Sequence, residues 1–231
     1  MTTADKIATA SENTPKVYEA GKQSEYDRFW DEYQRNGNAT DYTGAFMGFG
    51  WNAETLNPKY DVTVTAGYMM FAFCGYDGDL DDVFKNRGLN LIFNLTATTS
   101  QGYMFYNSKI KAIGDIDLSA IDDSNKLSSE FNTPYLETIR NLIPPKAAMQ
   151  ATCWGAGLTN LGVGGKIAYN WTLTRSTKLT HDSLMNVINA LADYSTDTSG
   201  TAHTLTLGAT NLAKLTDTEK AIATSKGWSL A

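Results

Sequence analysis

The sequence has few of the residues that build metal centres and disulfide frameworks. Its 231 residues include two cysteines and two histidines. Cys74 and Cys153 are widely spaced and lie in apolar stretches, so we expect two buried free thiols rather than a disulfide framework. Neither His181 nor His203 has a cysteine or histidine at zinc-ligand spacing. The sequence therefore predicts no metal site of this kind.

Surplus basic charge and long apolar runs are also missing. The 19 basic and 25 acidic residues give a net charge of −6, which leaves no cationic face for a phosphate backbone and predicts no nucleic-acid partner. The longest apolar run, residues 68–74, is well short of the roughly 20 residues that cross a bilayer. The first ten residues lack the apolar stretch of an export signal. We expect a soluble protein with no membrane partner.

Signatures of catalysis and cofactor binding are absent as well. No nucleophile elbow, phosphate loop or dinucleotide fingerprint occurs. The acidic stretch 77–82 resembles the start of a calcium loop, but Asp82 and Gly88 occupy the positions that require glycine and glutamate. We interpret this stretch as a solvated turn that caps a short helix over residues 80–84. The sequence predicts no enzyme and no catalytic, cofactor-binding or metal residues, with a hydrolase that uses paired carboxylates as the alternative.

Aromatic residues are plentiful instead, and several fall on one predicted helix. Hydrophobic residues make up 42% and aromatic residues 11% of the chain, enough for a sizeable core. Residues 1–14 are polar and aperiodic and predict a mobile arm. Thr14 and Pro15 favour a helix start, and Asn36-Gly37 favours its end. The aromatic face of this helix comprises Tyr18, Tyr26, Phe29, Trp30 and Tyr33.

Two interpretations of this aromatic helix are open. It packs on the rest of the domain, or part of it docks a partner. We therefore take Tyr18, Tyr26, Phe29, Trp30 and Tyr33 as candidate partner contacts. The segment that follows, residues 38–68, mixes aromatic residues with Gly, Asn and Pro and predicts irregular structure with a short strand over 61–65.

A weak repeat begins near Phe105. Residues Phe105, Phe131, Cys153 and Thr174 are each followed five residues later by an apolar residue, namely Ile110, Leu136, Leu158 and Leu179. The steps between these apolar residues are 26, 22 and 21 residues (110 to 136, 136 to 158, 158 to 179). Such periods are typical of leucine-rich repeats, in which each coil supplies a short strand and buries its apolar face on its neighbours. A β-sandwich is the alternative.

The C-terminal segment, residues 179–231, predicts a helix–strand–helix cap. Thr180 and the next residues open a helix, with His181 beside its start, and residues 203–208 alternate as a strand does. Thr216 and Glu219 have capping-box spacing and begin a last helix. The predicted fold is therefore a β-rich α/β protein, a short leucine-rich-repeat-type solenoid with an N-terminal helical segment and a C-terminal cap.

Two regions follow from this organisation. Residues 1–66 hold the arm, the aromatic helix and the irregular segment, and we expect them to serve in anchoring or oligomerisation. Residues 67–231 hold the leucine-rich-repeat-like solenoid, with its cap over 179–231.

Several stretches of the sequence resemble a known family. The block that begins LTHDSLMNVINALADYSTDTSG, residues 179–231, is similar to the terminal segment of BspA-like leucine-rich-repeat proteins. Residues 16–46, from KVYEAGKQSEYDRFWDEYQ onward, resemble a segment that accompanies such repeats in proteins of gut-bacterial phages and prophages. YMMFAFCG and YMFYNSKIKAIGDIDLS fit the same pattern. The resemblance implies an adhesive or scaffolding module without catalytic residues. Residues 144–165 depart from the family pattern, so we expect an irregular coil there.

The expected function is that of a non-catalytic phage virion structural protein. It would be a head or tail decoration or a fibre-like protein of host attachment, located in the virion, and would act through protein–protein or glycan contacts. The expected partners are its own subunits in a homo-oligomer, other virion proteins, or a host surface protein or glycan. One alternative is a BspA-like adhesin on the bacterial cell surface, which would need export. The other is a glycan-active enzyme.

Overall fold

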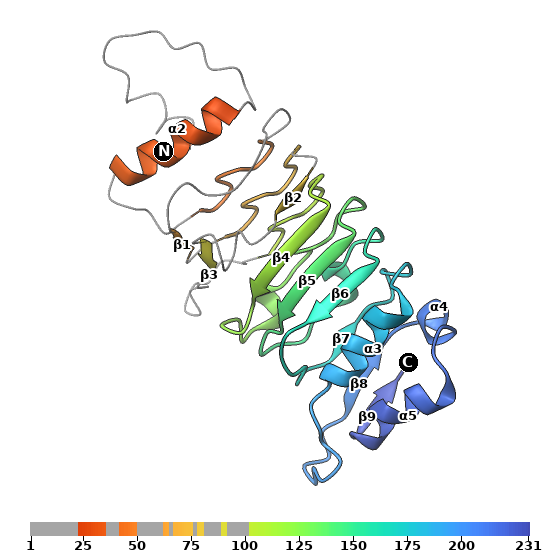
Figure 1. The fold of residues 1–231 in the computed structure, drawn as a ribbon. Helices are drawn as coiled ribbons and strands as arrows, with labels where there is room; N and C mark the ends of the chain where they lie inside the picture. Colours follow the sequence, from red (N-terminus) through yellow and green to blue (C-terminus); the bar gives the residue numbers. More distant parts are fainter. Residues whose placement is uncertain are drawn as a thin grey trace, which may run out of the picture.

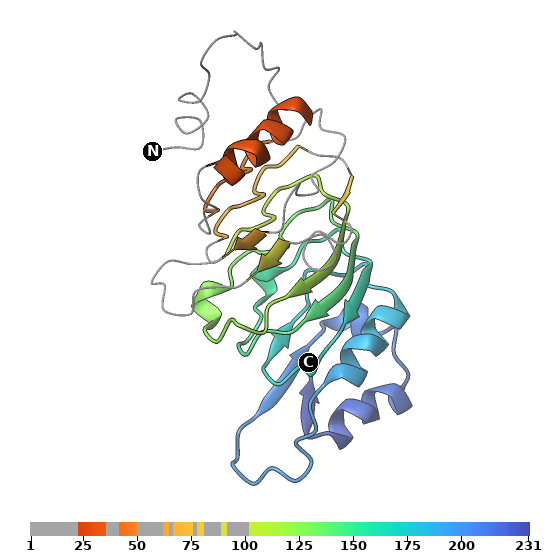
Figure 2. The same ribbon diagram turned by 60° about the vertical axis from the view of Figure 1, so that its left-hand side comes forward.

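The computed structural model describes residues 23–35, 42–49, 62–64, 67–75, 78–80, 89–91 and 102–231. Helix α2 (Gln23–Arg35) lies at one end of an elongated stack of layers, and the C-terminal helices lie at the other end (Figures 1 and 2). Helices and parallel strands together confirm the mixed α/β class expected from the sequence. The arm predicted over residues 1–14 lies outside the described residues.

The strands form three small sheets. The first pairs β1 (Val62–Val64) with β3 (Leu89–Leu91). The second contains, in order, β2 (Asp79–Leu80), β4 (Ala112–Asp117), β5 (Thr138–Ile143) and β6 (Asn160–Val163). The third contains β7 (Trp171–Thr172), β8 (His203–Thr206) and β9 (Trp228–Leu230). Every strand pair in the described residues is parallel, unlike the antiparallel sheets of a β-sandwich.

The residues of the predicted repeat align across the four-stranded sheet. Ile113 of β4 lies opposite Ile139 of β5, which in turn lies opposite Leu161 of β6. The repeat positions Ile110, Leu136, Leu158 and Leu179 are each at most 1% exposed. The apolar period found in the sequence therefore marks the inner side of stacked layers, each bonded to the next by parallel pairing.

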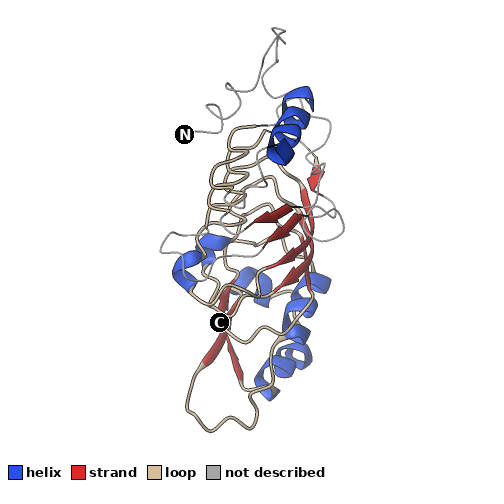
Figure 3. Ribbon diagram, turned by 90° about the vertical axis from the view of Figure 1, so that its left-hand side faces the viewer, coloured by secondary structure: helices blue, strands red, loops and turns tan. Residues whose placement is uncertain are grey.

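Turn segments stack on the side of the layers opposite the main sheet (Figure 3). We define four of them, residues 42–49, 67–75, 102–108 and 128–133. The backbone N–H groups of Phe46, Phe71, Phe105 and Phe131 donate to the carbonyls of Met70, Met104, Glu130 and Cys153 at 2.8–2.9 Å. Other N–H groups close tight turns within one segment, as Ala72 does on the Met69 carbonyl. The segments thus combine local turns with a parallel ladder between layers.

A ladder of buried aromatic rings runs through these layers. It comprises Phe46, Phe71, Phe105, Phe131, Trp154 and Trp171, each at most 2% exposed, with successive ring centroids 5.3–5.9 Å apart. These separations are normal for stacked or tilted aromatic pairs. The ladder joins residues 42–49 to residues 67–75, so the stacking continues across the position 66/67 at which the sequence suggested two regions.

The layer that contains β6 is irregular, as expected for residues 144–165. The pairing of β5 with β6 changes register between Ile139 and Leu142. A Cβ atom on Gly162 would lie only 2.0 Å from the Arg140 carbonyl oxygen. Because real Cβ atoms do not approach a backbone oxygen this closely, the two layers can pack at this distance only with glycine at this position.

The C-terminal cap contains the predicted helix, strand and helix. Helix α3 (His181–Ala190) begins at Thr180, whose side chain accepts the Ser183 N–H. Helix α5 (Asp217–Ser225) begins with a complete capping box between Thr216 and Glu219. Within the cap the structure adds α4 (Ala209–Leu212) and β9, which the sequence did not predict. Outside the cap it adds the short strands β3 and β7 and two 3-10 turns, η1 (Ser124–Lys126) and η2 (Ala151–Cys153).

One local prediction is wrong at its first residue. The acidic stretch was expected to cap a helix over residues 80–84, but Asp79 and Leu80 form strand β2, paired with Ala112 and Ile113 of β4. At Leu80, pairing with the neighbouring layer outweighs the local capping preference. Residues 81–84 lie outside the described residues. The predicted strand over 61–65 is confirmed by β1.

The two cap helices are joined by an imidazole–carboxylate contact. His181 Nε2 lies 2.8 Å from Glu219 Oε1, so the histidine at the start of α3 contacts the capping-box glutamate of α5. This hydrogen bond and the negative charge of Glu219 raise the pKa of His181 above 6.5. Hydrogen bonds from the backbone N–H and the side chain of Thr216 lower the pKa of Glu219, and the contact with His181 lowers it further. The sequence placed His181 beside a cap but gave no sign of this pairing.

Gly162→Ala should lower the free energy of unfolding by about 1–3 kcal/mol, the usual cost of overpacking. Gly165→Ala is the matched control, because its Cβ would meet the Pro144 side chain at 3.1 Å rather than a backbone carbonyl. Urea unfolding of both variants at one pH measures the difference. Equal losses in the two variants would contradict the close-approach argument.

The His181–Glu219 contact should stabilise the cap at low pH, and this stabilisation should be lost as pH rises. A histidine whose pKa is raised on folding stabilises the folded state below its ordinary pKa of 6.5, and this contribution is lost as pH rises through the raised value. The melting temperature of wild type should therefore exceed that of His181→Gln at pH 6, with a smaller difference at pH 9. A difference that does not change with pH would show that the contact carries no charge-dependent stability.

Candidate functional site: an exposed aromatic face

The predicted contact residues on α2 are mostly used inside the chain. Tyr26 and Trp30 are each 1% exposed. Their rings pack on Phe46, at centroid distances of 5.3 and 5.8 Å, and Trp30 also lies 6.4 Å from Tyr42. Phe29 is half-buried and lies 4.8 Å from Phe46. Tyr26, Phe29 and Trp30 therefore pack on the rest of the domain, against the first layer of the stack, rather than serving as free partner contacts.

Two of the five candidate contacts cannot be placed. Tyr18 lies outside the described residues, and Tyr33 is within α2 but its side chain is not described. Their role as partner contacts stays a prediction.

A different set of aromatic residues reaches the surface. Four rings form a connected cluster on two adjacent turn segments, Tyr68 and Phe73 on one and Tyr103 and Tyr106 on the next. The ring centroids of Tyr68 and Tyr103 are 5.9 Å apart, those of Tyr103 and Tyr106 are 5.3 Å apart, and those of Phe73 and Tyr106 are 5.5 Å apart. All three contacts are edge-to-face. We call these four residues the aromatic face.

The aromatic face is accessible to solvent. Phe73 is 40% exposed, and the three tyrosines are half-buried. Met47, on the preceding turn segment, is 51% exposed. Large apolar side chains gathered at the surface in this way are a recognised mark of an interaction site.

The backbone under the aromatic face adopts an uncommon conformation. Met69, Phe73, Tyr103 and Asn107 have φ of 55°, 55°, 62° and 52°, in the left-handed region. The first turn segment uses glycine at the same two positions relative to its ladder ring, Gly44 and Gly48, with φ of 63° and 72°. The turn geometry thus repeats from layer to layer, whereas the residues that adopt it do not.

Left-handed conformation disfavours these larger residues. A residue with a Cβ atom costs roughly 1–2 kcal/mol in this region relative to glycine, with Asn penalised less. Large residues such as Phe73 and Tyr103 therefore occupy positions at which glycine would suit the backbone better. Clusters of such outliers occur at binding and catalytic sites, which supports a functional role for the side chains they carry.

The residue types of the aromatic face are those found at protein–protein interfaces. Aromatic residues and methionine are enriched at the centres of protein interfaces, where charged residues are depleted. Tyr68, Tyr103 and Tyr106 each add a hydroxyl group that both donates and accepts a hydrogen bond. The four side chains of the face include no acid–base pair.

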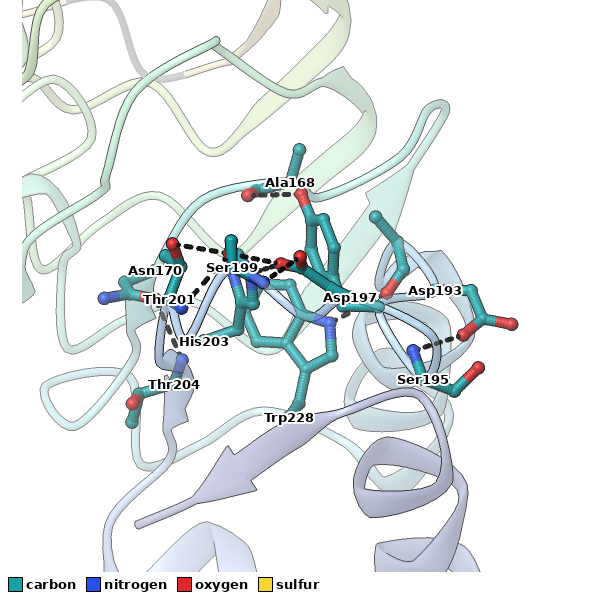
Figure 4. Close-up of polar contacts among 12 residues, drawn as sticks. Ala168, Asn170, Asp193, Ser195, Asp197, Ser199, Thr201, His203, Thr204 and Trp228 are labelled. Carbon is teal, nitrogen blue, oxygen red and sulfur yellow. Dashed lines mark hydrogen bonds and ion pairs between the residues drawn. The ribbon is translucent and has the colours of Figure 1, made fainter.

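The second histidine lies in a packed cluster of the cap (Figure 4). The His203 ring stacks on Tyr194 with a centroid distance of 3.7 Å and lies 5.3 Å from Trp228. Its Nε2 atom is 3.8 Å from Asp197 Oδ2, beyond hydrogen-bond range. Tyr194 donates to the Ala168 carbonyl at 2.9 Å, and burial raises its pKa. These contacts link the loop that precedes β8 to Ala168 and to the sheet that contains β8 and β9.

The structure also shows the state of the two thiols, the metal-ligand groups and the helix lengths within the described residues. Cys74 and Cys153 are buried free thiols, as predicted. Across the described ranges, no group of three or more His, Cys, Asp or Glu side chains is placed to hold a metal ion. Among the helices that the structure describes, none is long and apolar enough to cross a membrane. Of the acidic stretch 77–82, only Gly78 to Leu80 are described.

Comparisons with protein-family models, with curated proteins and with solved structures find no match to this chain.

A comparison of two stretches of the sequence could have pointed to the aromatic face, although the apolar spacing did not. The stretches that begin at Tyr68 and Tyr103 share a tyrosine, a methionine and a ladder phenylalanine. Their alignment places Phe73 and Asn107 at one position, two residues after the ladder ring. Phe73 and Asn107 thus show that the surface side chain at this position differs between layers, whereas the ladder ring two residues earlier is phenylalanine in both.

Phe73→Asn should change the free energy of unfolding by no more than about 1 kcal/mol. Loss of a half-exposed ring is offset by a residue better suited to left-handed backbone, as Asn107 shows at the equivalent position. Phe71→Ala is the contrast, because removal of a buried ladder ring typically costs about 3–5 kcal/mol. Urea unfolding of both variants tests this, and a Phe73→Asn loss as large as that of Phe71→Ala would remove the case for a surface role.

Proposed function

We propose that this chain is a non-catalytic interaction protein in which the stacked layers form a short leucine-rich-repeat-type solenoid. The parallel register of Ile113, Ile139 and Leu161 at steps of 26 and 22 residues supports this, as do the buried repeat positions. Helix α2 and the C-terminal cap would protect the two ends, as terminal elements of repeat arrays do.

The aromatic face is the observation that carries the proposed function. It presents Tyr68, Phe73, Tyr103 and Tyr106 on a frame that local turns and the ring ladder hold in place. A rigid set of aromatic side chains loses little conformational freedom on binding, which favours affinity. We propose that this face, rather than α2, makes the main contact with a protein partner.

We propose further that the protein is a structural component of a phage virion. The resemblance of residues 16–46 to a segment of phage-encoded and prophage-encoded repeat proteins supports this assignment. In a virion the aromatic face would contact another subunit of the same chain, a neighbouring virion protein or a host receptor. A BspA-like adhesin on the bacterial surface would use the same face on a host protein or glycan.

Light scattering on the purified chain and its variants tests the contact role. The double variant Phe73→Asn, Tyr106→Ser should convert an oligomeric wild type to monomer. The control is Tyr169→Ser, which removes a tyrosine that is 44% exposed in a later layer. Dissociation by the control to the same extent would show that the aromatic face is not the specific contact.

Mass spectrometry of purified phage particles tests the virion assignment. The chain should be present in particles in a fixed ratio to the major capsid protein. A wild type that is monomeric in solution and absent from particles would overturn the assignment, and binding of such a monomer to host glycans on an array would favour the adhesin.

A further inference from the structure

Glu130 is a carboxylate buried in the stack without a partner among the described residues. It lies on the turn segment 128–133, one residue before the ladder ring of Phe131, and is 2% exposed. Neither of its carboxyl oxygens has a hydrogen-bond partner in the described part of the chain. Since a buried polar group is normally hydrogen-bonded and a buried charge is normally paired, this residue requires an explanation.

Equivalent positions in three other layers carry apolar or thiol side chains. The residues that precede the ladder rings of Phe71, Phe105 and Trp154 are Met70, Met104 and Cys153, each at most 1% exposed. The residues that precede the two outer rings, Phe46 and Trp171, are the half-buried Ala45 and the exposed Asn170. The buried part of this column therefore accepts an uncharged side chain at the layers on either side of Glu130. Glu130 is the one carboxyl group in this described column, between Met104 and Cys153.

Burial decides which form of the carboxyl group the fold accepts. Removal from water raises the pKa of Glu130 from 4.5 to about 8. Backbone contacts with Glu130 and Ser128, which do not reach hydrogen-bond geometry, oppose this rise only in part. Cys153 is the titratable neighbour from the next layer, and burial followed by the charge of Glu130 raises its thiol pKa to about 12. Lys126, four residues before Glu130 in the sequence, has its Nζ 3.5 Å from Asp122 Oδ1. No cation is among the groups that shift the pKa of Glu130.

We propose that Glu130 is a proton-controlled latch of the layer stack. With the proton bound, the neutral carboxyl group fits the apolar column and the layers stay closed. When the proton leaves, the carboxylate must be hydrated, and the segment 128–133 separates from the layers on either side.

The contacts around Glu130 indicate what this separation would expose. Its carbonyl accepts the Phe105 N–H at 2.8 Å, and the adjacent Phe131 N–H donates to the Cys153 carbonyl at 2.9 Å. The Cys153 thiol donates to the carbonyl of Leu127, the residue just before this segment, at 3.8 Å. Opening of this segment therefore breaks hydrogen bonds to both neighbouring layers and gives reagents access to Cys153.

The first test compares the unfolding of wild type with that of Glu130→Gln, which stays neutral at every pH. A carboxyl group whose pKa is raised on folding stabilises the folded state below its unfolded pKa, and this stability is lost as pH rises to the folded pKa. The unfolding constant of wild type relative to Glu130→Gln should rise about tenfold per pH unit between about pH 5 and 8. Glu130→Met, which reproduces the Met104 side chain of the adjacent layer, serves as a second neutral variant in case the amide is poorly accommodated.

The second test measures access to Cys153 in the intact chain without denaturant. The rate of alkylation by iodoacetamide is followed by mass spectrometry of the Cys153 peptide, and each rate is divided by that of the unfolded chain at the same pH. This ratio should increase from pH 6 to pH 9 in wild type and stay constant in Glu130→Gln and Glu130→Met. Parallel pH profiles of wild type and both neutral variants, in unfolding or in alkylation, would overturn the latch.

Discussion

The stacking of one layer on the next is the constraint on which the rest of this structure depends. A single layer supplies a strand of a few residues, one tight turn segment and one aromatic ring, too little to enclose a core. The parallel strand pairs on one side and the backbone ladder of the turn segments on the other fix the register. The rings of Phe71, Phe105 and Phe131 fill the space between them. Burial of each layer therefore requires its neighbours, and the core is continuous along the stack.

A stack of this kind needs its two ends covered, and the chain does this with different chemistry at each. At the N-terminal end, Tyr26 and Trp30 of α2 lie over the first ladder ring, Phe46. At the C-terminal end, α3 packs against β6 and α5, and α5 packs against β9 of the last sheet. The Lys226 ammonium group donates to the Ile188 and Asn189 carbonyls at the end of α3. Aromatic surface covers one end, and capped helices with polar tethers cover the other.

The sequence predicted the features that depend on local or periodic signals. Ile110, Leu136 and Leu158 were found because burial on one side of each layer imposes an apolar period, and Thr216 with Glu219 because a capping box is local. The first layer was missed because its turn segment contains two left-handed residues, Gly44 and Gly48, and has no strand or helix period. The aromatic face was missed for a related reason. Phe71 and Phe73 are two residues apart, yet one is 1% and the other 40% exposed, a difference set by the neighbouring layers rather than by the local sequence.

The ladder rings are unevenly spaced along the chain. Phe71 follows Phe46 by 25 residues, Phe105 follows Phe71 by 34, and Phe131 follows Phe105 by 26, although the three ring separations differ by only 0.6 Å (5.3 to 5.9 Å). The ring contacts are thus insensitive to the length of the connection between layers, in keeping with the weak dependence of loop entropy on length. Natural selection can lengthen or shorten a connection without disturbing the frame. The connections between layers and the frame of stacked rings can then change independently of each other within the same chain.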